Sequence, residues 1–511
     1  MAKKLTKVAS GIPGFDEISH GGVPKGRTTL ASGTSGSGKT VFSAQFLYKG
    51  VKEYGENGVF VTFEETPVDI IKNTNSFGWD IGKLIKENKW AFVDASPDEA
   101  DNLEVGTYDL GAFLARIEYA ITKVKAKRVV IDSASALFTH FQDPGIIRRE
   151  LYRLTYRLKQ LKVTCIMTAE RPVEDGQISR YGVEEFVSDN VILLHNRLTE
   201  QGERERTIEI LKFRGSSHDS QEAALIVGDP GVSLYPRPKP KLTGKGFSEK
   251  ISTGIKGLDK LFHGGVYKNS TTLITGASGC GKTVTTLHFI MEGAKQRENS
   301  LLIEFEESPG QLYRNAASFG WDLKKHVDDG TVQLVCHYPE DLKAEQYLKI
   351  IQDLVIANKI KRLVLDSLSA LQRIYDERKF RQFVIGLNAF LKMHDVTSYL
   401  TNTTSQLLGI TAITETHLST ATDNIIILKY VELGGQMRRL LSVLKQRGSM
   451  HDKELTEFEV SSEGVQTIGP FKGIENLMSG SARRIQVSFG DEEQQEQAER
   501  DFIGEAVAGR I

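Results

Sequence analysis

The sequence predicts an α/β protein that contains two copies of one domain, each a mostly parallel sheet flanked by helices. Three observations support this fold class. A glycine-rich loop occurs twice, several further segments recur at nearly the same spacing, and short β-branched runs alternate with amphipathic stretches such as 108–124 and 347–358. The length of 511 residues also exceeds what a single hydrophobic core usually supports.

The two glycine-rich loops, 33–40 and 276–283, both match the pattern G-x-x-x-x-G-K-[ST]. In this pattern glycines let backbone N–H groups surround phosphate oxygens, the lysine adds a positive charge, and the threonine hydroxyl can ligate Mg²⁺. Two matches in the same context disfavour the alternative, a pair of ordinary glycine-rich turns. The predicted nucleotide-binding residues of the loops are Gly36, Ser37, Gly38, Lys39, Thr40, Gly279, Cys280, Gly281, Lys282 and Thr283.

The repeated segments also define the domain boundaries. His-Gly-Gly precedes each loop, at 20–22 and 263–265, and Ser-Phe-Gly-Trp-Asp follows each loop, at 76–80 and 318–322. A proline-rich stretch between the copies is typical of an extended linker. We therefore expect a first domain at 1–235, a linker at 236–247, a second domain at 248–486 and a charged tail at 487–511.

An aspartate ends an apolar predicted strand in each copy, Asp132 after 128–131 and Asp366 after 362–365. A carboxylate in this place can hold Mg²⁺ through water, as a Walker B residue does. The competing interpretation is an aspartate that caps the next helix. The phosphate loop upstream in each copy favours the Walker B interpretation.

A pair of glutamates follows another predicted strand in each copy, Glu64 with Glu65 and Glu306 with Glu307. Paired acids at a strand end, in a domain that binds a nucleoside triphosphate, are candidates for the base that activates an attacking oxygen. The alternative is that the acids begin the next helix, whose dipole favours negative charge there. One acid of each pair would suffice for the catalytic role.

A Lys-x-Arg pair recurs late in each copy, Lys212 with Arg214 and Lys445 with Arg447. Alternate positions of a strand place both cations on one face, where they could reach phosphate across a subunit boundary. Basic residues on a strand commonly form only a solvated face. The recurrence of the pair together with Gly-Ser-x-His favours a functional role.

The two copies differ just upstream of a shared Asp-Asn strand start. Residues 185–188 read Glu-Phe-Val-Ser in the first copy, and 419–422 read Ser-Thr-Ala-Thr in the second. Three hydroxyl side chains therefore stand where the first copy has one.

Composition narrows the function classes. The formal net charge is −1 and no dense basic tract occurs, which disfavours nucleic-acid binding. Because no apolar run is long enough to span a membrane, we expect a cytoplasmic protein without a membrane partner. Cys165, Cys280 and Cys336 lie far apart, which argues against a disulfide framework and a zinc site.

At these residues the chain resembles the KaiC family of circadian clock ATPases over nearly its whole length. The resemblance rests on the two phosphate loops, the two Phe-Glu-Glu segments, the recurrent Lys-x-Arg-Gly-Ser-x-His, and 417–423, which is similar to the family's autophosphorylation motif. It implies two tandem RecA-like P-loop NTPase domains, ATP and Mg²⁺ as cofactors, and a double-ring homohexamer with ATP between neighbouring subunits. In that family the N-terminal ring hydrolyses ATP, and the C-terminal ring phosphorylates and dephosphorylates itself.

The resemblance also implies a role for each acid. Glu64 and Glu65 would activate water in the first ring, and Glu306 and Glu307 would serve the kinase site. Glu306 is the preferred general base and a metal-binding residue.

The other implied roles concern phosphorylation and nucleotide contact. Ser419 and Thr420 would be the phosphorylated residues, Thr40 and Thr283 would ligate Mg²⁺, and Arg373 would lie near the phosphorylation sites. Further implied nucleotide contacts, several of them from a neighbouring subunit, are Ser76, Lys212, Arg214, Ser216, His218, Asp229, Phe319, Arg439, Lys445, Arg447, Ser449 and His451.

Some segments depart from the family's pattern. Phe319 stands where the family has tryptophan, a change that keeps an apolar contact to the base. The stretch 471–484 resembles the family's switch loop, but the tail beyond it does not match the peptide bound by the activator KaiA. We therefore expect a KaiB-like partner on the first domain, no dependence on a KaiA-like activator, and a histidine kinase or response regulator as output partner.

Two other functions use the same loops. A RecA-like nucleic-acid-dependent ATPase would need basic loops that line a channel, and it would show DNA-stimulated hydrolysis. A nucleotide-gated scaffold without autokinase activity would keep its signalling function when Ser419 and Thr420 are replaced by alanine.

Overall fold

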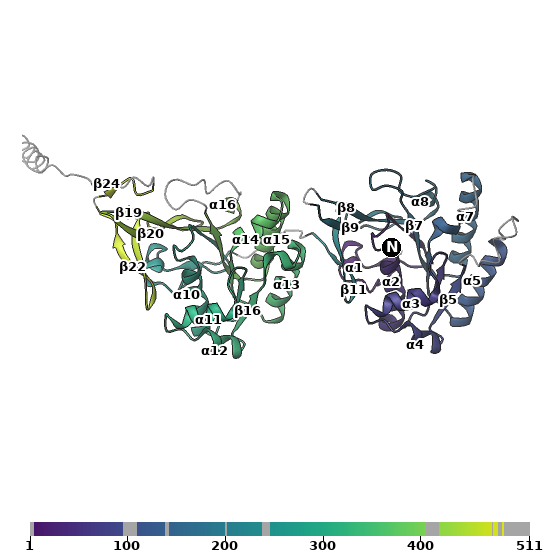
Figure 1. The fold of residues 1–511 in the computed structure, drawn as a ribbon, viewed down its shortest axis with the longest axis horizontal. Helices are drawn as coiled ribbons and strands as arrows, with labels where there is room; N and C mark the ends of the chain where they lie inside the picture. The colour runs from purple at the N-terminus through teal and green to yellow at the C-terminus, as the bar shows by residue number, and fades with distance from the viewer. Residues whose placement is uncertain are drawn as a thin grey trace, which may run out of the picture. The chain divides into compact units, whose positions relative to one another are not determined.

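The computed structural model describes residues 5–95, 110–137, 143–199, 202–237, 246–404, 418–472, 474–478 and 483–484. The chain divides into two compact units, 1–238 and 239–511, each with its own large sheet (Figure 1). None of the described helices is long and apolar enough to cross a membrane.

The first unit contains a nine-stranded sheet in the order β11-β10-β9-β8-β3-β7-β6-β4-β5. The strands from β8 to β5 in this order pair in parallel, and β9, β10 and β11 extend the sheet with antiparallel pairs. The strands are β3 (Thr28–Gly33), β4 (Gly58–Thr62), β5 (Trp90–Asp94), β6 (Arg128–Asp132), β7 (Thr164–Glu170), β8 (Asn190–Leu198), β9 (Arg204–Phe213), β10 (Ala223–Gly228) and β11 (Gly231–Tyr235), with a small pair β1 (Lys7–Val8) and β2 (Val23–Pro24).

Helices cover both faces of this sheet, so its parallel strands are buried on both sides. In β4, Phe60 packs on the face covered by α2, and Val59 and Val61 pack on the face covered by α5 and α7. The helices α5 and α7 lie side by side (Figure 1), and an ion pair between Glu118 of α5 and Arg157 of α7 joins them. The helices are α1 (Phe15–Ile18), α2 (Lys39–Tyr54), α3 (Pro67–Asn75), α4 (Ile81–Lys86), α5 (Leu110–Val124), α6 (Ala134–Leu137), α7 (Pro144–Gln160) and α8 (Glu184–Val187).

The second unit repeats this architecture. Its sheet has nine strands in the order β16-β15-β17-β18-β14-β19-β20-β21-β22, which is the same connectivity written from the other edge. The strands are β14 (Thr271–Gly276), β15 (Ser300–Glu304), β16 (Val332–Cys336), β17 (Arg362–Asp366), β18 (Thr397–Thr403), β19 (Asn424–Leu433), β20 (Gln436–Gln446), β21 (Thr456–Ser461) and β22 (Gly464–Pro470), with small pairs β12 (Lys250–Ile251) with β13 (Val266–Tyr267) and β23 (Ile474–Glu475) with β24 (Arg483–Arg484).

The helices of the second unit cover both faces of its sheet, α10 on one face and α13 with α15 on the other. They are α9 (Lys256–Leu261), α10 (Lys282–Lys295), α11 (Pro309–Ala317), α12 (Leu323–Asp328), α13 (Ala344–Ala357), α14 (Leu368–Ile374), α15 (Glu377–Met393) and α16 (Leu418–Ala421), with a 3₁₀ turn at Pro339–Asp341. The fold class predicted from the sequence is confirmed in both halves.

A buried arginine joins helix, strand and N-terminal segment in each unit. Arg128, which begins β6, pairs with Glu56 at 2.7 Å and donates to the carbonyl oxygens of Phe46 and Ala9, both at 2.8 Å. Its guanidinium also lies 4.4 Å from the centre of the Phe46 ring, a cation–π contact. Arg362 makes the corresponding pair with Glu298 at 2.6 Å.

Some predicted boundaries shift or cannot be compared. The amphipathic stretch predicted from 347 forms α13, which begins earlier, at Ala344, because the Gln346 side chain accepts the backbone N–H of Lys343 and caps the helix. The stretch predicted from 108 forms α5 from Leu110, and 96–109 lie outside the described residues. Most of the predicted linker, part of the predicted switch loop and the whole predicted tail also lie outside them.

Candidate functional site

The first phosphate loop joins β3 to α2 at the carboxyl end of the central strand. Gly36 and Gly38 adopt φ values of 73° and 95°, in the left-handed region that favours glycine. Lys39 begins α2, and its Nζ donates hydrogen bonds of 2.9 Å to the carbonyl oxygens of both Gly33 and Thr34. The loop therefore wraps around the positive N-terminal end of α2, a geometry that suits a phosphate anion.

The second loop has the same geometry between β14 and α10. Gly279 and Gly281 adopt φ values of 77° and 108°. Lys282 begins α10, and its Nζ donates hydrogen bonds of 2.9 Å to the carbonyl oxygens of Gly276 and Ala277. The two cradles predicted from the sequence are thus alike in backbone conformation and in the position of the lysine.

One loop residue in each copy is buried under the cradle. Ser37 and Cys280 are both fully buried. A Cβ atom added at Gly276 would lie 2.7 Å from the Cys280 sulfur, so the glycine is needed for this close packing. Burial raises the pKa of Cys280, which makes its thiol unreactive. Ser37 and Cys280 can therefore contact a phosphate through their backbone N–H groups but not through their buried side chains.

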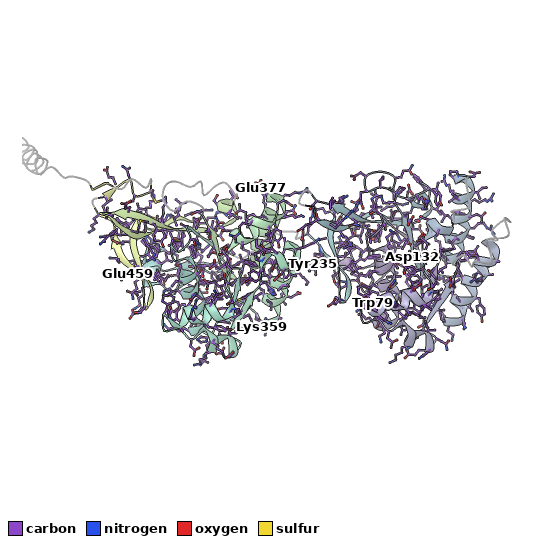
Figure 2. The ribbon with its side chains drawn as sticks, in the orientation of Figure 1. Trp79, Asp132, Tyr235, Lys359, Glu377 and Glu459 are labelled. Atoms are coloured by element: carbon purple, nitrogen blue, oxygen red, sulfur yellow. The ribbon has the colours of Figure 1, made fainter. Side chains whose placement is uncertain are left out.

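The predicted Walker B aspartates end the strands β6 and β17. Asp366 accepts a hydrogen bond of 2.7 Å from the Thr283 hydroxyl and another from the Thr401 hydroxyl, and burial raises its pKa. Asp132, a half-buried residue of the first unit (Figure 2), accepts a hydrogen bond from the Thr168 hydroxyl. The second domain therefore brings together the loop threonine and the strand aspartate that the sequence predicts for Mg²⁺.

The acid pair of the first domain follows β4. Glu64 accepts a hydrogen bond of 3.3 Å from the Ser133 hydroxyl, beside Asp132. Its pKa is raised, first by burial and then by the negative charge of Glu170. Glu65 accepts a hydrogen bond of 3.1 Å from Asn73 of α3.

The acid pair of the second domain has different partners. Glu306 forms an ion pair of 2.8 Å with Arg373. Glu307 accepts a hydrogen bond of 2.8 Å from Asn315, and its pKa is raised, first by burial and then by the charge of Asp366. A carboxylate with a raised pKa is a better proton acceptor, so Glu307 remains a candidate beside Glu306, whose choice as the base stays a prediction.

A third carboxyl group in the second domain was not singled out by the sequence. Glu304 ends β15, is 3% exposed, and pairs in register with Asp366 of β17. It accepts a hydrogen bond of 3.1 Å from the backbone N–H of Glu306, and burial followed by the charge of Asp366 raises its pKa. The equivalent residue in the first domain is Thr62, so a residue-by-residue comparison of the repeats would have found this carboxyl.

Two other predicted nucleotide contacts lie beside the loops. Asp229 is in the exposed turn between β10 and β11, and Val227 of β10 packs against the first loop. The Arg439 guanidinium lies 5.6 Å from the centre of the Tyr430 ring, and the Tyr430 hydroxyl donates a hydrogen bond of 2.7 Å to the carbonyl oxygen of Gly279.

Ser76 and Phe319 follow the helices α3 and α11. The Ser76 hydroxyl donates a hydrogen bond of 2.7 Å to the carbonyl oxygen of Asn73. The half-buried Phe319 ring lies 5.2 Å from the ring of Trp321. Within the described chain, both side chains are thus engaged at the end of their own helix.

The second Lys-x-Arg pair holds the predicted phosphorylation segment. Lys445 Nζ donates hydrogen bonds of 2.5 and 2.7 Å to the carbonyl oxygens of Ser419 and Thr422. Arg447 donates one of 3.0 Å to the carbonyl oxygen of Thr420. Ser419 is half-buried and Thr420 is exposed, so these bonds fix the backbone of α16 and leave the Thr420 side chain facing outward.

The first Lys-x-Arg pair holds the equivalent helix of its own domain. Lys212 Nζ donates hydrogen bonds of 3.1 and 3.0 Å to the carbonyl oxygens of Glu185 and Ser188. Arg214 follows β9 and its side chain is half exposed. The remaining predicted contacts lie in the loops after these pairs and are Ser216, His218, Ser449 and His451.

The predicted acceptor hydroxyls and the phosphate loop lie at opposite ends of β14. The loop follows Gly276, whereas Asp423, just after α16, accepts a hydrogen bond of 2.9 Å from the backbone N–H of Thr271 at the start of the strand. The strand spans roughly 16 Å at about 3.3 Å per residue. Ser419 and Thr420 therefore lie at the opposite end of the parallel strands from their own loop.

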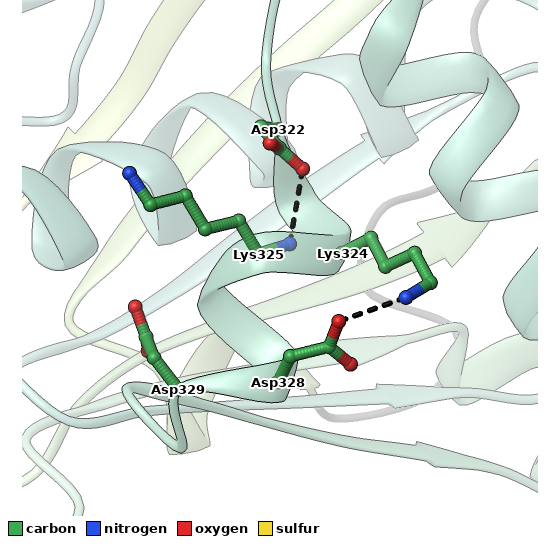
Figure 3. Close-up of a pocket in the computed structure, with 5 residues that line it drawn as sticks. All are labelled: Asp322, Lys324, Lys325, Asp328 and Asp329. Atoms are coloured by element: carbon green, nitrogen blue, oxygen red, sulfur yellow. Dashed lines mark hydrogen bonds and ion pairs between the residues drawn. The ribbon is translucent and has the colours of Figure 1, made fainter.

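A groove of 480 Å³ beside α12 is separate from these elements (Figure 3). Lys324 pairs with Asp328 at 2.8 Å, and Asp322 accepts the backbone N–H of Lys325 at 3.0 Å as the helix cap. The charged groups of the groove thus serve the helix itself.

A mostly parallel sheet, a phosphate loop that leads into a helix, and an acid at the end of a nearby strand define a RecA-like P-loop NTPase, and this chain contains two of them. Both loops bring backbone N–H groups and a lysine together, which suits a nucleoside triphosphate, and the second loop adds the oxygen pair of Thr283 and Asp366.

The comparisons with known proteins identify the family. The model of the family described as ATPase: KaiC matches residues 8–239 and again 251–471. The circadian clock oscillator protein KaiC of Parathermosynechococcus lividus is 48% identical over 488 residues, which cover 96% of this chain and 90% of that protein. The protein of the same name from Synechococcus elongatus is 47% identical over 484 residues, covering 94% of this chain and 93% of the relative. The chain belongs to the KaiC family of ATPases.

Proposed function

We propose that this chain is a Mg²⁺-dependent ATPase and Ser/Thr autokinase and autophosphatase that acts as a circadian-type timing or signalling switch. The relatives named circadian clock oscillator proteins match nearly the whole chain, which supports this role. In the proposal the first domain hydrolyses ATP, and the second transfers phosphate to Ser419 and Thr420 and removes it again.

In the first domain, Lys39 and the loop N–H groups bind the phosphates, and Thr40 and Asp132 serve the metal. Glu64 or Glu65 takes a proton from the attacking water. The raised pKa of Glu64, caused chiefly by burial, supports its role as proton acceptor. Mg²⁺ supplies charge neutralisation at the β- and γ-phosphate oxygens when bound.

In the second domain, Lys282, Thr283 and Asp366 hold the nucleotide and metal. Glu306 or Glu307 takes the proton from the acceptor hydroxyl, so that a serine or threonine oxygen replaces water as nucleophile. The products are a phosphorylated side chain and ADP.

The observation that carries the proposal is the separation of Ser419 and Thr420 from their own phosphate loop. A transfer requires reacting atoms within about 3–3.5 Å, far less than the length of β14. A neighbouring chain could dock the end of its sheet that carries the phosphate loop against the end that carries Ser419 and Thr420. The hydroxyls and the cations Lys445 and Arg447 of one chain would then reach the nucleotide of the other. Head-to-tail contacts of this kind form a closed ring when the rotation between neighbours closes, and the proposed homohexamer is such a ring.

The same reasoning extends to partners. A KaiB-like protein is the proposed partner on the first domain, and a histidine kinase or response regulator is the proposed output. A KaiA-like activator is not part of the proposal, because the tail from 487 lacks the expected peptide.

Phosphosite mass spectrometry after incubation with Mg-ATP tests the kinase assignment. We expect phosphate on Ser419 and Thr420 and none on Thr422, which is fully buried and donates its hydroxyl to the carbonyl oxygen of Leu418. The matched variant Thr422→Val should keep labelling, and the double variant of Ser419→Ala and Thr420→Ala should lose it. Folded wild-type protein without label at both residues would refute the kinase.

Light scattering during size-exclusion chromatography tests the assembly. We expect a hexamer with ATP and a smaller species without it. A monomer under both conditions would contradict transfer between neighbouring chains. Hydrolysis that DNA stimulates would instead support a nucleic-acid-dependent ATPase.

A further inference from the structure

A second cluster of ligand-type side chains lies in the first domain, where β8, β9 and the segment before β10 meet. His195, Glu209 and Glu222 each place one ligand atom so that all three atoms lie within 4.8 Å of one another. The His195 side chain is 4% exposed, and the two glutamates are each 27% exposed. The cluster is therefore a mostly enclosed site with one imidazole and two carboxylates.

The buried nitrogen of His195 faces the carboxylates. Nε2 is 3.5 Å from Glu209 Oε1, yet it has no hydrogen-bond partner among the described residues. An enclosed polar nitrogen without a partner costs free energy unless something binds it. The chain thus aims an unsatisfied ring nitrogen at two acidic side chains.

The other ring nitrogen indicates which tautomer is present. Nδ1 of His195 lies 3.2 Å from Glu174 Oε2 and 3.5 Å from an Arg171 nitrogen. The shorter contact, to the carboxylate, requires a proton on Nδ1, and in the neutral ring this leaves a lone pair on Nε2. A carboxylate that orients a histidine in this way is the usual support of a metal-bound imidazole.

Glu222 is also held in place. Its Oε2 accepts hydrogen bonds of 2.7 Å from both Arg197 and Thr207. Both bonds end on the same carboxylate oxygen. Oε1 carries neither bond and can serve as a ligand atom.

The second domain provides an internal contrast. The positions equivalent to His195, Glu209 and Glu222 are occupied by Lys429, Ser442 and Leu455, as the matching strand registers show. Lysine carries its own positive charge and leucine offers no ligand atom. The cluster is therefore a feature of the first domain and not a consequence of the shared fold.

We propose that His195, Glu209 and Glu222 form a binding site for one divalent transition-metal ion in the first domain. One imidazole nitrogen and two carboxylate oxygens match the ligand preferences of Zn²⁺ and Co²⁺, and three protein ligands leave a further position for water. The site is distinct from the Mg²⁺ position at the phosphate loop, because it uses none of Thr40, Asp132 or Glu64.

The site is connected to the first phosphate loop through Glu174. This carboxylate accepts hydrogen bonds from the Thr34 hydroxyl of the loop and, at 2.8 Å, from the backbone N–H of Asn196. The Asn196 side chain donates a further bond of 3.1 Å to the carbonyl oxygen of Ser35. Metal bound to His195 would therefore fix the residue that also holds the edge of the loop, so that occupancy stabilises the first domain.

The test uses the tag-free full chain, stripped with a chelator and then dialysed against Co²⁺ in a buffer with Mg-ATP. Co²⁺ held by nucleotide contributes equally to every variant, so the difference between variants isolates the proposed site. We expect one more Co²⁺ per chain in the wild-type protein than in His195→Gln, with visible absorption from the extra ion. Equal Co²⁺ content in the two proteins would overturn the proposal.

Further variants separate metal binding from folding. Glu209→Gln and Glu222→Gln change less buried residues, and each should weaken Co²⁺ binding at least about tenfold even if His195→Gln does not fold; Glu174→Gln should weaken it by about 10- to 100-fold. His337→Gln, which removes a half-exposed histidine outside the cluster, should leave binding unchanged. If His337→Gln loses as much Co²⁺ as Glu209→Gln, the binding is nonspecific and the proposal is wrong.

Thermal unfolding with Zn²⁺ is the second readout. At a Zn²⁺ concentration about 100 times the dissociation constant, the melting temperature of the first domain should rise by roughly 5–10 °C in wild-type protein and not in Glu209→Gln. A rise of equal size in both proteins would contradict a site at these residues.

Discussion

The two domains have the same scaffold and differ where its strands end. Both have the same strand order, the same lysine at the start of the helix after the loop, and the same buried arginine at the start of β6 or β17. At the phosphate-loop edge, however, Thr62 of the first domain is replaced by the buried Glu304. At the opposite end of the parallel strands, Ser-Thr-Ala-Thr at 419–422 replaces Glu-Phe-Val-Ser at 185–188.

In a duplicated fold, the residues that pack the core and the residues that carry out the chemistry can change independently of one another. Residues that pack between sheet and helices stay apolar in both copies while their size changes, as Trp90 and the equivalent Val332 show. Residues at strand ends, such as Thr62 and the equivalent Glu304, differ in chemistry between the copies. The second domain has the buried Glu304 beside its loop, and the hydroxyl residues Ser419 and Thr420 at the opposite end of β14.

The largest expected effect separates the two reactions. Glu306→Gln combined with Glu307→Gln should lower phosphorylation of Ser419 and Thr420 by about 10²- to 10⁴-fold, since no base remains for the hydroxyl proton. Hydrolysis by the first domain should continue. Glu64→Gln combined with Glu65→Gln should have the reverse effect, and phosphate release and phosphosite labelling measure the two rates. A parallel loss of both activities in either variant would contradict the division of labour.

The next effect should be equal in the two domains. Arg128→Met and Arg362→Met each remove a buried guanidinium. The half-buried glutamate then lacks its partner and two backbone carbonyl oxygens lack a donor, which should cost about 3–5 kcal/mol of unfolding free energy. Denaturant unfolding, followed separately for each domain, measures this cost. Lys324→Met removes the exposed pair with Asp328 and is the control, with an expected change below about 1 kcal/mol. A much larger loss in one domain would show that the arginines are not equivalent.

A smaller effect should be confined to the second domain. Burial lowers the pKa of His288 to about 4, and its Nε2 accepts the backbone N–H of Val465 at 2.8 Å. Gln45, the equivalent residue in the first domain, accepts the backbone N–H of Val232 at 2.6 Å and does not titrate. An unfolded histidine titrates near about 6.5.

The sign of the pH effect follows from these values. The stability that depends on neutral His288 is complete above about pH 6.5 and is lost as pH falls toward 4. At about pH 4.5 the loss should reach roughly 2–3 kcal/mol. Calorimetry of His288→Gln should show that this part of the acid sensitivity disappears from the second domain. An unchanged pH profile in the variant would mean that His288 does not contribute.

The smallest effect concerns the helix that follows each acid pair. Thr66 and Ser308 cap α3 and α11 by accepting the backbone N–H of Asp69 and Gln311. Replacement of either cap by alanine should cost about 1 kcal/mol, measured by denaturant unfolding. The bond from the backbone N–H of Ser308 to Gln311 at 2.8 Å is kept in Ser308→Ala, so the two replacements should cost about the same. A larger loss for Thr66→Ala would contradict this reasoning.

Local patterns were enough to predict the phosphate loops, the strand-end aspartates and the acid pairs. Each of these depends on residues close in the sequence, and the internal repeat made every match visible twice. His195 and Glu304 were missed for a physical reason. Their meaning depends on strands that pair across long separations, such as β8 with β9 and β15 with β17. The expectation of no zinc site considered cysteines only and did not test mixed histidine and glutamate sets.

The sequence by itself determined that the chain contains two α/β nucleotide-binding domains and that only the second has the hydroxyl-rich segment, because loop chemistry and hydrophobic periodicity are local properties. The tertiary structure alone decided which side chains meet. In the folded chain Thr283 donates a hydrogen bond to Asp366, the buried Glu304 lies opposite Asp366 on the neighbouring strand, and His195 lies close to Glu209 and Glu222. The tertiary structure also placed the hydroxyls at the opposite end of β14 from their loop. The strands β14 and β19 are parallel, so the segment before β19 lies at the start of β14, whereas the loop follows the end of β14.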